Sequence, residues 1–108
     1  MRNKSYSIIY NMPAGETVRI DFRWALDKNE IRDFSINLSL LEGEKSIDVY
    51  RLDTSHGYIH EHRLWKSLKP ERIEENYNRA FAEKKEEILN NFARWIALFK
   101  KSRGGEYG

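Results

Sequence analysis

The chain has 108 residues, of which 40% are hydrophobic and 33% are charged, and its formal net charge is +2. This balance excludes an intrinsically disordered chain, and the length fits a single domain over residues 1–108. The absence of cysteine excludes disulfides and thiolate chemistry. No apolar run is long enough to cross a membrane, and residues 1–10 lack the apolar segment of a signal peptide. We therefore expect a cytoplasmic protein that has no contact with a membrane.

Alternation of apolar and polar residues runs through residues 5–65 and predicts a β-sheet. It is clearest over residues 17–26, where Val18, Ile20 and Phe22 alternate with charged residues. Short polar turns separate the alternating runs, and short turns favour sequential antiparallel pairing because parallel strands need a long crossover. The sequence thus predicts an antiparallel β-meander of about five strands.

From Pro70 onwards the apolar residues follow the spacing of a helix instead. Pro70 suits the first helical position, and the acidic residues just after it favour a helix start. Gly104 and Gly105 favour a stop. We therefore predict one long C-terminal helix over residues 70–103 and a flexible tail over residues 104–108. The fold class is α+β, with the helix covering the sheet face that carries Trp24 and Phe34.

All three histidines of the chain, His56, His60 and His62, lie within seven residues. They fall on a predicted hairpin, in which residues 46–53 and 58–65 flank a four-residue turn. Side chains two residues apart on a strand point the same way, so His60 and His62 are expected side by side. Whether their face meets the core or the solvent is left open by the pattern of residues, which is apolar on neither face.

Charged residues surround these histidines. If four residues close the hairpin, Arg51 lies opposite His60 and Val49 lies opposite His62, with Asp53 at the mouth of the turn. Imidazoles that titrate near neutral pH could serve as general base and general acid in cleaving a phosphodiester. Arg51 would then stabilise charge on the phosphate, and Asp53 would orient a histidine. This interpretation makes His60, His62, Asp53 and Arg51 the catalytic residues and needs no cofactor.

Two other chemistries fit the same segment. His56, His60 and His62 could hold a divalent metal such as zinc, since neutral imidazole is a common ligand. Alternatively, the segment could bind RNA without cleaving it, through Arg63 and through further arginines on the sheet, which are Arg19 and Arg23. His-x-His pairs also occur on strands where they are simply solvated or make one hydrogen bond, and that interpretation stands beside the functional ones.

Residues 50–62 read Tyr-Arg-Leu-Asp-Thr-Ser-His-Gly-Tyr-Ile-His-Glu-His. This stretch resembles a motif of small uncharacterised archaeal and bacterial proteins, in which a strand ending in Asp leads through a short loop into His-x-His. It is similar, more distantly, to the TumE-like toxin components of toxin–antitoxin pairs. The resemblance implies a toxin-like ribonuclease that acts on RNA and is kept silent by an antitoxin protein. A homodimer, formed through an exposed strand edge or the helix, is the partner expected if the protein only binds.

Overall fold

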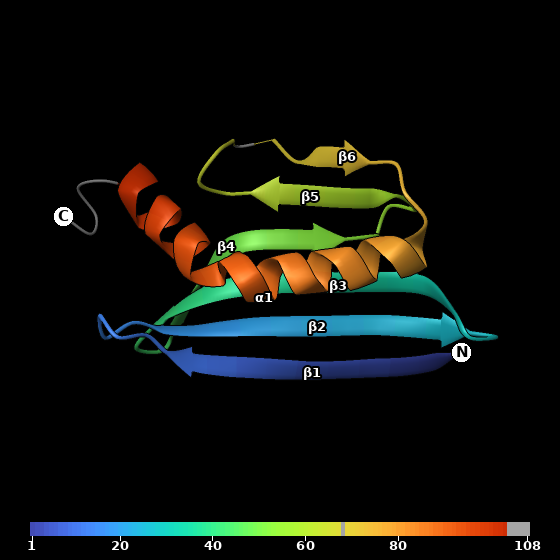
Figure 1. Cartoon of the computed structure of the whole chain (residues 1–108), viewed down its shortest axis with the longest axis horizontal. Coiled ribbons are helices and arrows are strands. Elements are labelled where there is room, and N and C mark those ends of the chain that lie inside the picture. Colours follow the sequence, from blue (N-terminus) through green and yellow to red (C-terminus); the bar gives the residue numbers. More distant parts are fainter. Residues whose placement is uncertain (68, 104–108) are drawn as a thin grey trace.

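The computed structural model describes residues 1–67 and 69–103. Six antiparallel strands form one sheet in the order β1-β2-β3-β4-β5-β6, and a single helix lies across one face (Figure 1). The elements are β1 Arg2–Asn11, β2 Thr17–Asp27, β3 Glu30–Glu42, β4 Lys45–Asp53, β5 Ile59–Arg63, β6 Glu71–Ile73 and α1 Tyr77–Ser102. The α+β class and the meander packed on one long C-terminal helix are therefore confirmed. The predicted tail, 104–108, lies outside the described residues.

Tight turns make the meander possible. Between β2 and β3 only Lys28 and Asn29 are unpaired, and both have positive φ angles, 52° and 66°. Two such residues form the hairpin turn whose twist matches that of the flanking strands. Between β3 and β4 the turn begins at Gly43, whose φ of 61° is easy for glycine. Each strand consequently pairs with the next along the chain.

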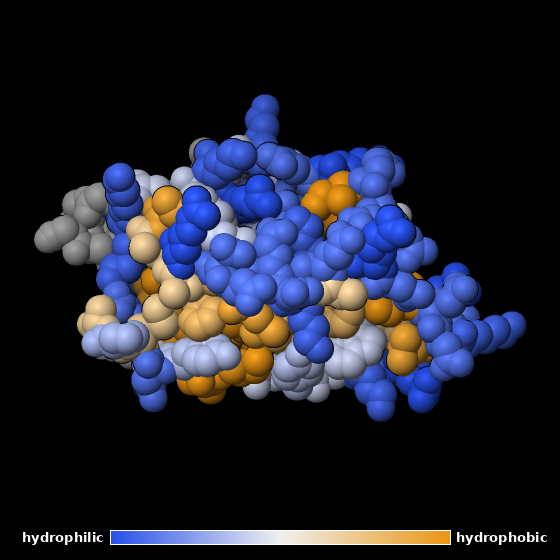
Figure 2. Space-filling view, viewed as in Figure 1, coloured by the Kyte–Doolittle hydropathy of each residue, from blue (hydrophilic) through white to orange (hydrophobic). Residues whose placement is uncertain are grey.

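The core lies between the sheet and one stripe of α1. Phe81 packs against Trp24 and Phe34 at ring-centroid distances of 5.2 and 5.3 Å, and Trp95 packs against Tyr50 at 4.6 Å. These contacts confirm that the helix covers the face of Trp24 and Phe34. In Figure 2, hydrophilic residues cover most of α1, whereas hydrophobic residues show between the helix and the β1 side of the sheet. Among the described residues, no helix combines the length and apolar character needed to span a bilayer.

The predicted helix start at Pro70 is wrong. Residues 71–73 form β6, which pairs with β5 so that Arg72 faces His60 and Ile73 faces Ile59. Ile73 packs against the core from this strand, and proline is tolerated just before an edge strand. The helix begins instead at Tyr77, after Asn76, whose side chain accepts a 3.1 Å hydrogen bond from the Arg79 backbone N–H.

A β-bulge explains why the alternation in β4 was ambiguous. Leu38 faces Tyr50 and Ser39 faces Asp48, so Val49 is an extra residue in the ladder. Val49 and Tyr50 are consequently both fully buried although they are neighbours in sequence. After the bulge, Tyr50 and the residues in step with it point toward α1, and Arg51 points to the opposite, helix-free face.

Candidate functional site

A small pocket lies on the helix-free face where β4 and β5 are joined. Its volume is about 190 Å3 and its lining comprises Arg51, Asp53, Ser55, His56, His60, His62 and Pro70. We call it the histidine pocket. All four residues expected to be catalytic, and the third histidine, line it. The structure therefore brings together residues that the sequence placed in one segment, and it puts them on the solvent side of the sheet.

The strand register pairs these residues differently from the expected hairpin. Asp53 faces His60 and Arg51 faces His62, whereas Arg51 opposite His60 and Val49 opposite His62 had been predicted. The difference is a shift of two residues, so every side chain keeps its face. The connection between β4 and β5 is longer than expected by these two residues. Within it, Thr54 to Gly57 form a separate turn, closed by a 3.0 Å hydrogen bond from the Gly57 N–H to the Thr54 carbonyl.

Each histidine of β5 makes one hydrogen bond through Nε2. His62 lies 2.9 Å from the carbonyl oxygen of Ser67, and a carbonyl only accepts, so this nitrogen carries the proton. Nδ1 of a neutral His62 therefore has a free lone pair. His60 Nε2 lies 2.9 Å from the Tyr58 hydroxyl. The His56 ring lies 4.9 Å from that of His60, measured between centroids.

Thr54 anchors the loop that carries His56. Its hydroxyl donates to the Asp33 carboxylate at 2.6 Å and accepts from the Phe34 N–H at 3.0 Å. The Asp53 carboxylate accepts from both the backbone N–H and the hydroxyl of Ser55, at 3.1 and 2.8 Å. Sequence reasoning missed Thr54 as a site-positioning residue, because a threonine in a polar turn carries no sign of its partners on another strand.

The arginines of the helix-free face are paired with aspartates. Arg19 contacts Asp21 at 3.0 Å. Arg23 contacts Asp33, also at 3.0 Å. The Arg23 guanidinium and the Thr54 hydroxyl together hold the pKa of the Asp33 carboxyl below its usual value. These two arginines lie on β2, three strands from β5, which corresponds to about 14 Å.

Arg51, inside the histidine pocket, has a looser partner. Its guanidinium lies 3.8 Å from the Asp48 carboxylate, and its side chain is 54% exposed. An exposed ion pair of this length contributes little to stability, so it does not hold the guanidinium firmly. Arg51 can therefore turn toward an anion in the pocket.

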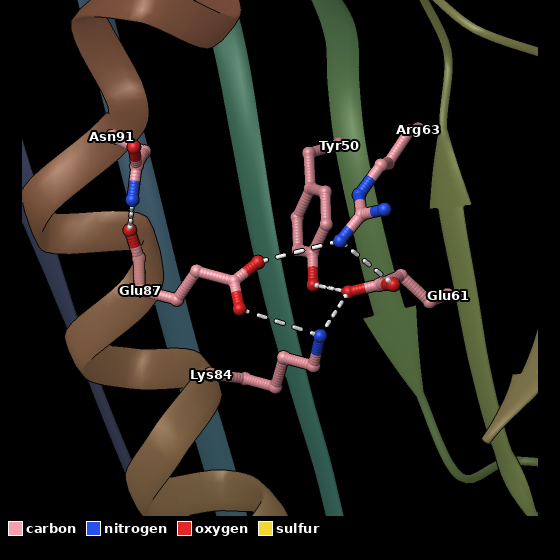
Figure 3. A network of polar contacts seen from close by, with 6 residues as sticks. All are labelled: Tyr50, Glu61, Arg63, Lys84, Glu87 and Asn91. Atoms are coloured by element: carbon pink, nitrogen blue, oxygen red, sulfur yellow. Dashed lines mark hydrogen bonds and ion pairs between the residues drawn. The ribbon is translucent and has the colours of Figure 1, made fainter.

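Arg63 lies on the other face of the sheet, under α1, and the structure does not bring it to the histidine pocket. It contacts Glu61 at 3.2 Å and Glu87 at 3.4 Å, in the network drawn in Figure 3. Lys84 completes this network from the helix, at 2.8 Å from Glu61 and 3.5 Å from Glu87. The Tyr50 hydroxyl donates to Glu61 at 2.6 Å. Burial, followed by the Glu61 charge, raises the pKa of Tyr50 far above its ordinary value.

This network was not foreseen from the sequence. Glu61 is only 3% exposed, yet it stands between two histidines in a run that reads as polar. Its carboxylate is tolerated because two cations and a hydroxyl surround it. For the zinc hypothesis, in contrast, the geometry gives no support within residues 1–67 and 69–103. No three His, Asp or Glu side chains there are arranged to hold a metal ion.

The fold and the histidine pocket define a small α+β domain with a polar cluster on the open face of its sheet. The chain belongs to the family of domains of unknown function DUF7718, which matches residues 1–105. No curated protein and no solved structure matches it. Membership in a family without a known function agrees with the resemblance to uncharacterised proteins. The similarity to TumE-like toxins stays a prediction.

Proposed function

We propose that the histidine pocket binds a phosphodiester of RNA and cleaves it by acid–base catalysis, and the resemblance of residues 50–62 to toxin components implies the same RNA-directed activity. The observation that carries the proposal is the convergence of two imidazoles, a guanidinium and a carboxylate in a pocket of about 190 Å3. His60 and His62 project from the same strand face about 6.7 Å apart at their Cα atoms. A phosphate group between them would meet one ring on either side.

The hydrogen bond of His62 supports different roles for the two histidines. His62 donates from Nε2 to Ser67, which leaves Nδ1 to take the proton from a ribose 2′-hydroxyl as general base. The 2′-oxygen then attacks phosphorus, the bond to the 5′-oxygen breaks, and protonated His60 supplies a proton to that leaving oxygen. The products are a 2′,3′-cyclic phosphate and a free 5′-hydroxyl.

Arg51 and Asp53 assist from β4. Arg51 faces His62 and would neutralise charge on the nonbridging phosphate oxygens, which are its preferred partners. Asp53 faces His60 on the neighbouring strand and would orient its imidazole for the acid role. Because such an activity would inhibit growth, the cell would need a partner protein that keeps it silent.

Degradation of single-stranded RNA by purified protein, with and without EDTA, tests the proposal. We expect cleavage that survives EDTA and falls about 100-fold or more in His60→Ala/His62→Ala. Arg51→Ala should also be impaired. The matched control is Arg32→Ala, which removes an exposed guanidinium on β3 that pairs with Asp27 and Glu30 away from the pocket. Cleavage that persists in the folded double variant would contradict the histidine mechanism.

A binding domain without catalysis is the second candidate. Arg19 and Arg23 are already matched by aspartates and so are less available to the phosphates of RNA, which makes a protein the favoured partner for such a domain. Well-folded wild-type protein that binds RNA or a protein partner but cleaves no RNA in either condition would establish this function. Growth of cells that express the wild-type chain alone gives an independent comparison, since only the toxin hypothesis predicts that His60→Ala/His62→Ala relieves inhibition.

A further inference from the structure

A second concave surface lies on the helix side of the sheet, between the segment after β5 and the C-terminal half of α1. Its volume is about 400 Å3 and its lining includes Trp65, Lys66, Arg94, Trp95 and Leu98. We call it the tryptophan groove. Volumes of this size are typical of sites for small organic ligands. The groove lies on the opposite side of the sheet from the histidine pocket and contains none of its residues.

The charges beside the groove are not balanced. Arg63 and Lys84 together match the two carboxylates of Glu61 and Glu87, so the network of Figure 3 is neutral as a unit. Lys66 and Arg94 add two further cations to the lining. Within residues 1–67 and 69–103, neither of these side chains forms an ion pair. The groove therefore presents two uncompensated positive charges and favours an anion.

An aromatic surface lies next to these cations. Trp65 packs on Trp95 with 5.3 Å between ring centroids and 34° between their planes. Trp95 is 6% exposed and fixed in the core, whereas Trp65 is only half-buried and lines the groove. The buried ring thus supports the outer one. An indole held in this way can stack against a flat ring of a ligand, and nucleobases stack on such side chains irrespective of sequence.

From the pairing of an indole with two uncompensated cations, we propose that the tryptophan groove binds one nucleotide unit. The base stacks on Trp65, and the phosphate lies between Lys66 and Arg94. The ligand is either a free nucleotide or a nucleotide within single-stranded RNA, because both present the same chemistry. The proposal stands on the groove alone and does not require the histidines to be catalytic.

The segment after β5 connects the two sites. Trp65 and Lys66 line the groove, while the carbonyl of Ser67 accepts the His62 hydrogen bond and Pro70 lines the histidine pocket. β6 pairs with residues 59–61 of β5, and Ser67 lies beside His62 at this edge of the sheet. A single strand of RNA could pass around this edge and occupy both sites. That arrangement predicts that RNA binds more tightly than a mononucleotide.

Binding is tested in the His60→Ala/His62→Ala protein, so that no cleavage interferes. The affinity for RNA is measured by the fluorescence anisotropy of a short fluorescein-labelled single strand. The affinity for a free nucleotide is measured by the quenching of tryptophan fluorescence by AMP. Trp24→Phe in the same protein removes the one tryptophan outside the groove. We expect Lys66→Ala/Arg94→Ala to weaken RNA binding about tenfold or more. The slope of log affinity against log salt should become shallower by about 0.7 for each phosphate that no longer meets a cation.

Trp65→Leu provides a second variant, because it keeps both cations and removes the stacking surface. It should weaken binding by about tenfold. Lys28→Ala/Lys45→Ala is the matched control, since it removes two exposed lysines, one in the turn after β2 and one at the start of β4, neither of which lines the groove. If the groove variants weaken the binding of both AMP and RNA, free nucleotides are ligands of the groove. If the protein binds RNA through the groove but does not bind AMP, the ligand is a nucleotide within RNA.

The proposal is overturned by any of three results. These are the absence of AMP and RNA binding, binding that the groove variants leave unchanged, and competition by inorganic phosphate as strong as that by AMP. The last result would show an anion site without base recognition. A failure of RNA cleavage in the wild type would leave these measurements unaffected, so the two proposals fail separately.

Discussion

The Tyr50 hydroxyl donates a 2.6 Å hydrogen bond to Oε2 of Glu61, from a strand that neighbours the one carrying the carboxylate. Both side chains are almost completely buried, at 0% and 3% exposure. A hydrogen bond to a buried charge is stronger than one between neutral groups, and its loss leaves the charge short of a partner. This hydrogen bond therefore supports the carboxylate that Lys84 of α1 contacts.

We expect Tyr50→Phe to lower the free energy of unfolding by about 1–2 kcal/mol, since Glu61 keeps Lys84 and Arg63 as partners. The phenyl ring retains the packing on Trp95. Urea unfolding measures the change. Tyr10→Phe is the control, because Tyr10 also stacks on a helix residue, Phe92, but its hydroxyl has no hydrogen bond within the described residues. Equal effects of the two substitutions would contradict the assigned role of Glu61.

Thr54→Val should loosen the loop beside the histidine pocket. Valine has nearly the same shape but cannot form the bonds to Asp33 and Phe34, so we expect a loss of about 1–2 kcal/mol in the free energy of unfolding. The His56 and His60 resonances should also shift in NMR spectra. Thr54→Ser keeps the hydroxyl and should retain most of the stability. A valine variant as stable as wild type would show that the loop does not depend on these bonds.

Asn76→Ala tests where the helix begins. The substitution removes the side-chain oxygen that accepts from the Arg79 N–H, and we expect it to cost about 1 kcal/mol of unfolding free energy. Asn90→Ala, at an exposed position inside α1, should be neutral or slightly stabilising because alanine is the better helix former. A helix that began at Pro70 would give both asparagines interior positions, and the two substitutions would then behave alike.

The lowered pKa of Asp33 predicts how the stability of the fold depends on pH. Its folded-state pKa lies below the ordinary value of 3.8, chiefly through the Arg23 hydrogen bond and next through Thr54. The ionised carboxylate thus stabilises the fold above that pH, and the contribution disappears as the pH falls through the lowered pKa. Asp33→Asn should flatten the loss of stability below about pH 4 in acid titrations of urea midpoints. Arg23→Gln should reproduce part of this flattening; an unchanged acid profile in both variants would contradict the assignment.

Local patterns were sufficient for much of this protein. Val18, Ile20 and Phe22 alternate with charged residues, and a strand places alternate side chains on opposite faces wherever it pairs. For the same reason His60 and His62 had to share a face, whichever register the hairpin adopted. The apolar stripe that includes Phe81, Ile88 and Trp95 likewise predicted a helix, because a period of 3.6 residues is a property of the segment alone.

Pairing between distant segments decided the rest. Residues 71–73 form a strand because they pair with β5 and because Ile73 packs against the core. The preceding proline and the nearby glutamates give no sign of either contact. The bulge at Val49 arises from the match between β3 and β4, and it fixes which face of β4 meets α1. Burial of Glu61 needed Lys84 to approach from the helix. The sequence determined which residues share a face, and only the tertiary structure decided what that face meets, since partners far apart in the chain leave no periodic signal.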